Sequence, residues 1–335
     1  MDLNNLINKI GIKQQEKENK ALDTYIGNSN QNKEKLETLL SEFKKIISDE
    51  AAYELCRYSG TDKCYNYISK KINNFNFDIN DVNLLTNNLS LYNDIKDTYD
   101  YIKNRKFGLS LSALINKTAS NGEKVQIITS IPVDYLFYKL ENAEAHVDIA
   151  GEYLGSEAKN SKIYADEAGD GAGWGMEGCE LNVNIAGEGL GYNAKNSKIY
   201  ADEAGEGAGI GMEGCELYVK KADEFIGRSA KNSKIYADEA GDRAGEFMEN
   251  CELHVKKAYN YLGYNAKNSK IYADEAGEGA GSFMQNSQLF IDKLEGKLYI
   301  SSLKGKNKIY LGRASYYQHY LKYKLMGVKI WKKEA

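Results

Sequence analysis

The sequence predicts an all-β solenoid, a parallel β-helix of 18-residue coils, with an α-helical domain before it. Three observations support this fold class. An apolar-x-apolar triplet recurs every 18 residues in the middle of the chain, and a single glycine recurs with the same period. The first 120 residues carry helical patterns instead. We therefore expect an α-helical domain over 1–120, a β-helix of about nine coils over 125–292, and a basic, tyrosine-rich cap over 293–335.

The repeat is most visible as the segment Lys-Asn-Ser-Lys-Ile-Tyr-Ala-Asp-Glu-Ala-Gly, which starts at Lys159, Lys195, Lys231 and Lys267. These starts are 36 residues apart, but the backbone period is half of that. The first apolar residue of the triplet recurs every 18 residues, at Ile163, Leu181, Ile199, Leu217, Ile235, Leu253, Ile271 and Leu289. Alternation of this kind is typical of a strand with one buried face, so each coil should contribute one strand.

One glycine occupies the same position in every coil, at Gly155, Gly173, Gly191, Gly209, Gly227, Gly245, Gly263 and Gly281. A constant glycine indicates a turn that only glycine fits. Extrapolation toward the N-terminus pairs Ala145 and Val147 with Ile127 and Thr129 of an earlier coil. The solenoid should therefore start near Val125.

Residues 18 apart should lie about 4.8 Å from each other in stacked coils, so their chemistry must be compatible. One position alternates in sign through Glu144, Lys162, Glu180, Lys198, Glu216, Lys234, Glu252 and Lys270 and ends at Gln288. A second alternates in size, because Met176, Met212, Met248 and Met284 are separated by alanines. We conclude that 36 residues is a packing period and 18 the backbone period.

The glycine spacing carries a family resemblance. The run Ala168-Gly169-x-x-Ala172-Gly173-x-x-Met176-x-Gly178-x-x-Leu181-x-Val183 resembles the glycine-rich GXGXG domain. That domain occurs in the large chain of glutamate synthase and in one of the chains of formylmethanofuran dehydrogenase, where it serves structure and assembly. The resemblance covers about residues 143–292 and implies a right-handed β-helix that acts as a scaffold. It transfers no catalytic residue.

The N-terminal region follows the i, i+3, i+4 template of an amphipathic helix at Leu36, Leu39, Leu40, Phe43, Ile46 and Ile47. Further helical patterns cover 51–57, 65–72, 82–102 and 109–115, with turns at Ser59-Gly60 and Asn73-Asn74. This domain is a candidate N-terminal cap. After Ile291 the 18-residue register fails, and the triplets Leu298-x-Ile300 and Ile309-x-Leu311, only 11 apart, suggest a closing cap with shorter strands.

The reactive side chains are better explained by packing than by chemistry. Cys179, Cys215 and Cys251 are two coils apart and should be small interior residues. Cys56 and Cys64 form no CxxC pair, and we expect neither a structural disulfide framework nor a zinc site. His146 and His254 fall in one outward column with Tyr164, Tyr200, Tyr218, Tyr236 and Tyr272, which predicts an exposed aromatic ladder.

The charge is unevenly distributed. Residues 1–124 carry 18 Lys+Arg against 17 Asp+Glu and residues 296–335 carry 10 against 1, so the net charge of -4 leaves -14 for residues 125–295. The basic, tyrosine-rich tail offers candidate partner contacts, although its composition is also that of a solvated cap. We expect it to bind no nucleic acid, because the acidic solenoid would repel a polyanion. These candidates are Lys304, Lys306, Lys308, Arg313, Lys322 and Lys324.

The function that these patterns favour is a non-catalytic scaffold or protein-interaction protein. One alternative is a structural subunit of a larger redox or amidotransfer enzyme, and a further one is a β-helix hydrolase acting on carbohydrate. We expect no catalytic residue, no cofactor and no metal site, and a protein partner of unknown identity. The N-terminus lacks the features of a signal peptide and no apolar stretch could span a membrane, so a cytoplasmic location is expected.

Overall fold

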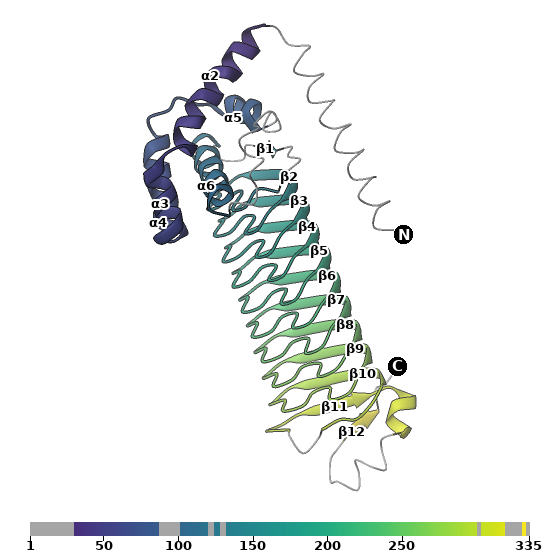
Figure 1. The fold of residues 1–335 in the computed structure, drawn as a ribbon. Coiled ribbons are helices and arrows are strands. Elements are labelled where there is room, and N and C mark those ends of the chain that lie inside the picture. Colours follow the sequence, from purple (N-terminus) through teal and green to yellow (C-terminus); the bar gives the residue numbers. More distant parts are fainter. Residues whose placement is uncertain are drawn as a thin grey trace.

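The computed structural model is a parallel β-solenoid with helices packed on its first turn (Figure 1). Twelve strands form one parallel sheet in chain order. The structure describes residues 30–86, 101–119, 124–127, 132–299, 303–318 and 330–332. The strands are β1 (Lys124–Ile127), β2 (Glu144–Ala150), β3 (Lys162–Ala168), β4 (Glu180–Ala186), β5 (Lys198–Ala204), β6 (Glu216–Ala222), β7 (Lys234–Ala240), β8 (Glu252–Ala258), β9 (Lys270–Ala276), β10 (Gln288–Leu294), β11 (Lys308–Leu311) and β12 (Ile330–Lys332).

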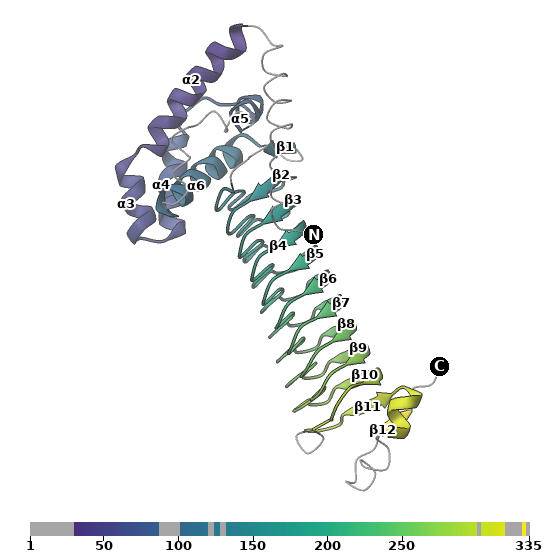
Figure 2. The same ribbon diagram turned by 45° about the vertical axis from the view of Figure 1, so that its right-hand side comes forward.

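The predicted 18-residue register is confirmed from β2 to β10. Ile163 lies opposite Leu181, and Leu181 lies opposite Ile199. All three side chains are fully buried, because alternate residues of each strand point into the tube. The remaining space inside is filled as predicted, since Met212 is fully buried and so are Ala194 and Ala230, one coil before and after it. Figure 2 shows the coils stacked in a single column.

Both ends of the sheet depart from the 18-residue register, a departure that was predicted for the C-terminal end alone. Val125, not Ile127, pairs with Ala145, so the first turn has 20 residues and the same face of β1 is still buried. At the other end Ile309 pairs with Leu289 and with Ile330, again through longer turns. The expected break in register is real, but β11 and β12 continue the parallel sheet beyond residue 292 and are not a separate set of strands.

The side of each coil opposite the strand is built from alternating left-handed residues. In one coil these are Gly189, Gly191, Asn193 and Asn196, with φ between 47° and 67°. From Gly155 to Gly281 the column of Gly191 is constant, because it faces inward: a Cβ at Gly191 would lie 2.3 Å from Cδ1 of the buried Ile199. The other left-handed columns accept larger side chains, so it is the lack of space that requires glycine in this column.

The helices are α2 (Asn30–Ile47), α3 (Glu50–Tyr58), α4 (Thr61–Ile72), α5 (Ile79–Thr86) and α6 (Tyr101–Thr118). The predicted apolar stripe of α2 is buried at Leu36, Leu39, Phe43 and Ile46. The predicted turns at Ser59-Gly60 and Asn73-Asn74 are confirmed. The predicted segment 109–115 lies within α6, which is longer and runs from 101 to 118. Of the predicted segment 82–102, residues 82–86 belong to α5 and 101–102 to α6, and 87–100 lie outside the described residues.

Helix α6 lies on the first turn of the solenoid, and its contacts are polar as well as apolar. Ser112 Oγ donates a hydrogen bond of 2.8 Å to the carbonyl of Tyr135, and Asn116 Nδ2 donates one of 2.9 Å to that of Tyr138. The Tyr138 hydroxyl donates to Asp62 of α4, at 2.9 Å. The first two of these contacts satisfy backbone carbonyls at the end of the solenoid.

Helices α3 and α4 form a hairpin that holds a disulfide between Cys56 and Cys64. The expectation that these cysteines form no structural disulfide is therefore wrong. The turn at Ser59-Gly60 reverses the chain, so that residues eight apart in sequence have their Cα atoms 5.0 Å apart, within the range of a disulfide. Within the described residues, no helix combines the length and the apolar character needed to cross a membrane.

Candidate functional site

The outer face of the sheet carries the predicted aromatic ladder, because the third residue of each strand points to solvent and the strands are in register. Tyr200 and Tyr218 have ring centroids 5.0 Å apart and planes within 8°, and Tyr218 and Tyr236 are 4.8 Å apart and within 5°. The row is interrupted at Asn182, beyond which His146 stacks on Tyr164. Its unbroken part comprises Tyr200, Tyr218, Tyr236, His254, Tyr272, Phe290, Tyr310 and Trp331.

The rings lean toward the first residue of each strand. The Tyr218 hydroxyl donates a hydrogen bond of 3.2 Å to Glu216, and His254 Nε2 lies 2.7 Å from Oε1 of Glu252. Burial, together with the neighbouring Glu216 carboxylate, raises the pKa of the Tyr218 hydroxyl, so the ring stays neutral at physiological pH. Because the ring faces are stacked on each other, the ladder presents its edges to a ligand.

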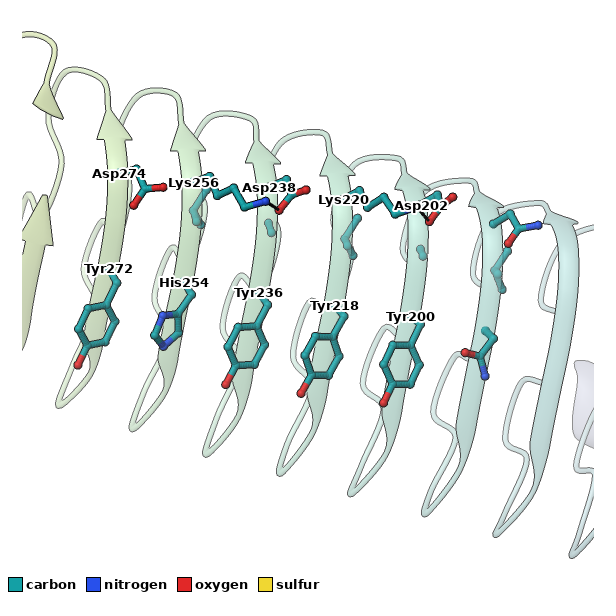
Figure 3. Close-up of a pocket in the computed structure, with 17 residues that line it drawn as sticks. Tyr200, Asp202, Tyr218, Lys220, Tyr236, Asp238, His254, Lys256, Tyr272 and Asp274 are labelled. Carbon is teal, nitrogen blue, oxygen red and sulfur yellow. Dashed lines mark ion pairs between the residues drawn. The ribbon is translucent and has the colours of Figure 1, made fainter. Parts of the chain in front are cut away.

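A groove of about 630 Å³ runs on the other side of the rings (Figure 3). It extends from Asn182 on β4 to Asp274 on β9 and crosses six strands. Ring edges form one wall, and the backbone of the fourth strand residues forms the floor, because their side chains point into the tube. These residues are Val183, Ala201, Val219, Ala237 and Val255. The fifth residues of the strands form the other wall, namely Asn184, Asp202, Lys220, Asp238, Lys256 and Asp274.

The charged wall alternates in sign and is held by ion pairs between neighbouring coils. Lys220 Nζ lies 2.6 Å from Oδ1 of Asp202, and Lys256 Nζ lies 2.6 Å from Oδ1 of Asp238. Figure 3 shows both pairs in one line along the groove. About half of each of these aspartate side chains remains exposed, so a ligand can reach them.

The alternating column at the first strand residue is also confirmed, since Lys198, Glu216 and Lys234 are adjacent in the ladder. A further row was missed in the sequence. It joins the corners before the strands and comprises Glu141, Lys159, Glu177, Lys195, Glu213, Lys231, Glu249, Lys267, Gln285 and Lys304. The 18-residue spacing from Glu141 to Gln285 is a signal that could have identified it.

The structure places four of the six predicted basic contacts. Lys304, Lys306, Lys308 and Arg313 are all exposed near the last turns of the solenoid, and Lys322 and Lys324 lie outside the described residues. Lys304 and Lys308 continue two of the alternating rows, each following a glutamine. Their positions are therefore also those expected for the ends of charge ladders.

The cysteines of the solenoid are interior residues, as predicted. Cys215 is 2% exposed, and its Sγ accepts a hydrogen bond of 3.4 Å from the Ser197 backbone amide. Burial raises the pKa of the thiols of Cys179, Cys215 and Cys251, which keeps them protonated and unreactive. In the part of the chain that the structure describes, no group of three or more His, Cys, Asp or Glu residues is arranged to hold a metal ion.

The fold and its surface define a parallel β-solenoid whose sheet face bears a straight, charge-patterned groove. No family model matches the chain, and no significant match was found among curated proteins or solved structures.

Proposed function

We propose that the chain is a non-catalytic scaffold that binds a protein partner through the outer face of its sheet. The observation that supports this most is the groove, which repeats the same surroundings over six strands from β4 to β9. A catalytic site concentrates distinct groups at one point, whereas a repeated groove suits an elongated partner. The predicted hydrolase is less well supported, because Asp202 and Asp238 are each ion-paired to lysine.

A photo-crosslinking experiment tests the binding role of this face. A benzoylphenylalanine residue replaces Tyr218 on the sheet face or, as a control, Trp174, which is 40% exposed on the turn side. Both chains are irradiated in an extract of the native source. We expect one protein adduct at position 218 and weaker or no crosslinking at position 174. Adducts that form only at position 174, or only diffusely at both, would contradict the proposed surface.

A structural role within a larger redox or amidotransfer enzyme is the second candidate. The inward glycine column of Gly191, with its left-handed conformation, supports the resemblance to the right-handed GXGXG helix. Such a resemblance concerns fold more than activity. Purification from the native source tests this candidate: stable recovery with defined enzyme subunits supports it, and recovery of the chain without them counts against it.

The basic C-terminal end allows the expected absence of nucleic-acid binding to be tested. Lys304, Lys306 and Lys308 are exposed and close in sequence, but the solenoid behind them is acidic. We expect no sub-micromolar binding of DNA or RNA oligonucleotides in an anisotropy titration at physiological salt. Tight binding that the triple change of these lysines to glutamate abolishes would overturn this expectation. Substitution is preferable to truncation, because Ile309 and Leu311 are buried in the sheet.

A further inference from the structure

The length of the groove sets the distance over which a ligand must match its charges. Six strands at about 4.8 Å spacing give a length of about 24 Å. An α-helix returns to the same side only after seven residues, about 10.5 Å, so it falls roughly 2 Å out of step over three carboxylates two coils apart.

The spacing of the charges along the groove indicates which backbone conformation of a bound peptide could match them. Asp202, Asp238 and Asp274 are two coils apart, which places successive carboxylates about 9.6 Å from each other. A β-strand repeats the same side every 6.6–6.8 Å or so and falls out of step. A polyproline II helix rises about 3.1 Å per residue with three residues per turn, so it repeats every 9.3 Å or so. Over the length of the groove, the mismatch between this repeat and the spacing of the carboxylates stays below about 1 Å.

The sign of the charges favours a basic ligand. The groove wall carries three carboxylates and two ammonium groups, and residues 125–295 have a net charge of -14. Lys220 and Lys256 lie between the carboxylates, so a basic side chain out of step would meet a like charge. The aromatic ring edges suit the pyrrolidine rings that would occupy the other two positions of each turn.

Building on the interaction role proposed above, we infer that the groove binds a peptide segment in the polyproline II conformation with a basic residue at every third position. The basic side chains contact the exposed halves of Asp202 and Asp238, which they share with Lys220 and Lys256, and they pair with Asp274. The intervening residues pack against the tyrosine edges. The peptide carbonyls face the open side and remain hydrated, as is usual for this conformation.

Fluorescence anisotropy with synthetic peptides tests the period. The probe is labelled (Pro-Pro-Lys)4, and the matched control has the same eight prolines and four lysines with the lysines two and four residues apart. We expect the regular peptide to bind the full chain at least tenfold more tightly than the permuted one. Equal affinities would mean that binding depends on net charge and not on the lysine spacing, which would overturn the inference. Tighter binding of (Pro-Pro-Glu)4, or no binding of any peptide, would overturn it as well.

Two matched variants test the site. Asp238→Asn removes the central carboxylate of the groove, and Glu239→Gln removes the same charge one residue later, outside the groove. We expect Asp238→Asn to weaken binding of the regular peptide about tenfold, and Glu239→Gln to leave the affinity within twofold of that of the unchanged chain. Equal losses would contradict the assigned site. Failure of all peptides combined with a protein adduct at position 218 would overturn the peptide class and leave the scaffold role standing, whereas absence of both would count against the face itself.

Discussion

The strand side and the turn side of each coil fill the same tube in opposite ways. The strand side sends large residues such as Ile199 inward from an extended backbone, and the turn side opposes it with Gly191 in a left-handed conformation. In the first turn the small and the large residue are exchanged. Ala145 takes the strand position of Ile199, and Phe137, eight residues earlier, takes the turn position of Gly191; Phe137 is fully buried and has a φ of 60°. The residue at this turn position is therefore set by the space that the strand leaves, since the left-handed conformation alone admits phenylalanine.

The largest expected effect comes from closing that space. Gly191→Ala places a methyl group 2.3 Å from Cδ1 of Ile199, whereas Gly189→Ala, at the same φ of 67°, meets nothing within 4 Å. Left-handed strain should cost both variants about 1–2 kcal/mol. Overpacking should cost Gly191→Ala about 1–3 kcal/mol more, measured as the free energy of unfolding in denaturant.

The double variant Gly191→Ala with Ile199→Ala sharpens this comparison. If space decides, the truncated isoleucine should accommodate the new methyl group, and the combined loss should be smaller than the sum of the single losses. Additive losses, or equal losses for Gly189→Ala and Gly191→Ala, would show that backbone conformation alone requires the glycine.

A substitution in the methionine column tests the packing of the interior on the turn side. Met212→Ala leaves three alanines in successive coils, at 194, 212 and 230, and opens a cavity. We expect a loss of about 2–5 kcal/mol in the free energy of unfolding, at the upper end if the neighbours cannot close the space. The control Ile185→Ala, at a position 50% exposed, should cost less than about 0.5 kcal/mol. Similar losses at both sites would be incompatible with the packing described.

The outer surface of the strand side should give the smallest effect. Glu216→Lys would stack a third positive charge between Lys198 and Lys234, where Lys198 Nζ now lies 3.6 Å from Oε2 of Glu216. We expect a loss of about 1 kcal/mol or less that shrinks in high salt, because the pair is partly exposed. The control Glu37→Lys, exposed on α2, changes the net charge equally and should cost less. A loss that did not respond to salt would point to packing instead of charge.

Much of the fold could be predicted because the repeat constrains it. From β2 to β10 an error of one residue would expose Leu181 and its equivalents, so the pattern admits only one register. The ends lack that constraint. Val125 pairs with Ala145 through a 20-residue turn, and Ile309 pairs with Ile330 through one longer still, and neither leaves a periodic signal. The Cys56–Cys64 disulfide depends on a helical hairpin whose closure the spacing alone does not reveal.

The candidate site was predicted only in part. The outward column of Tyr218 follows from the period, but the direction in which its ring leans does not. In the structure the ring leans toward Glu216, to which its hydroxyl donates a hydrogen bond, and the groove lies on the other side, beside Lys220 and Asp238. A residue pattern assigns side chains to a face, whereas a groove arises from how those side chains lie on it.

The alternation of Met212 with Ala194 and Ala230 has a consequence for the gene as well as for the protein. Deletion of one 18-residue coil would bring two methionines, or two alanines, into adjacent coils and place like charges next to each other in every alternating row. Deletion of 36 residues would keep both the alternation of large and small residues and the alternation of charge at the new junction. The solenoid should therefore lengthen by duplication, or shorten by loss, of two coils at a time.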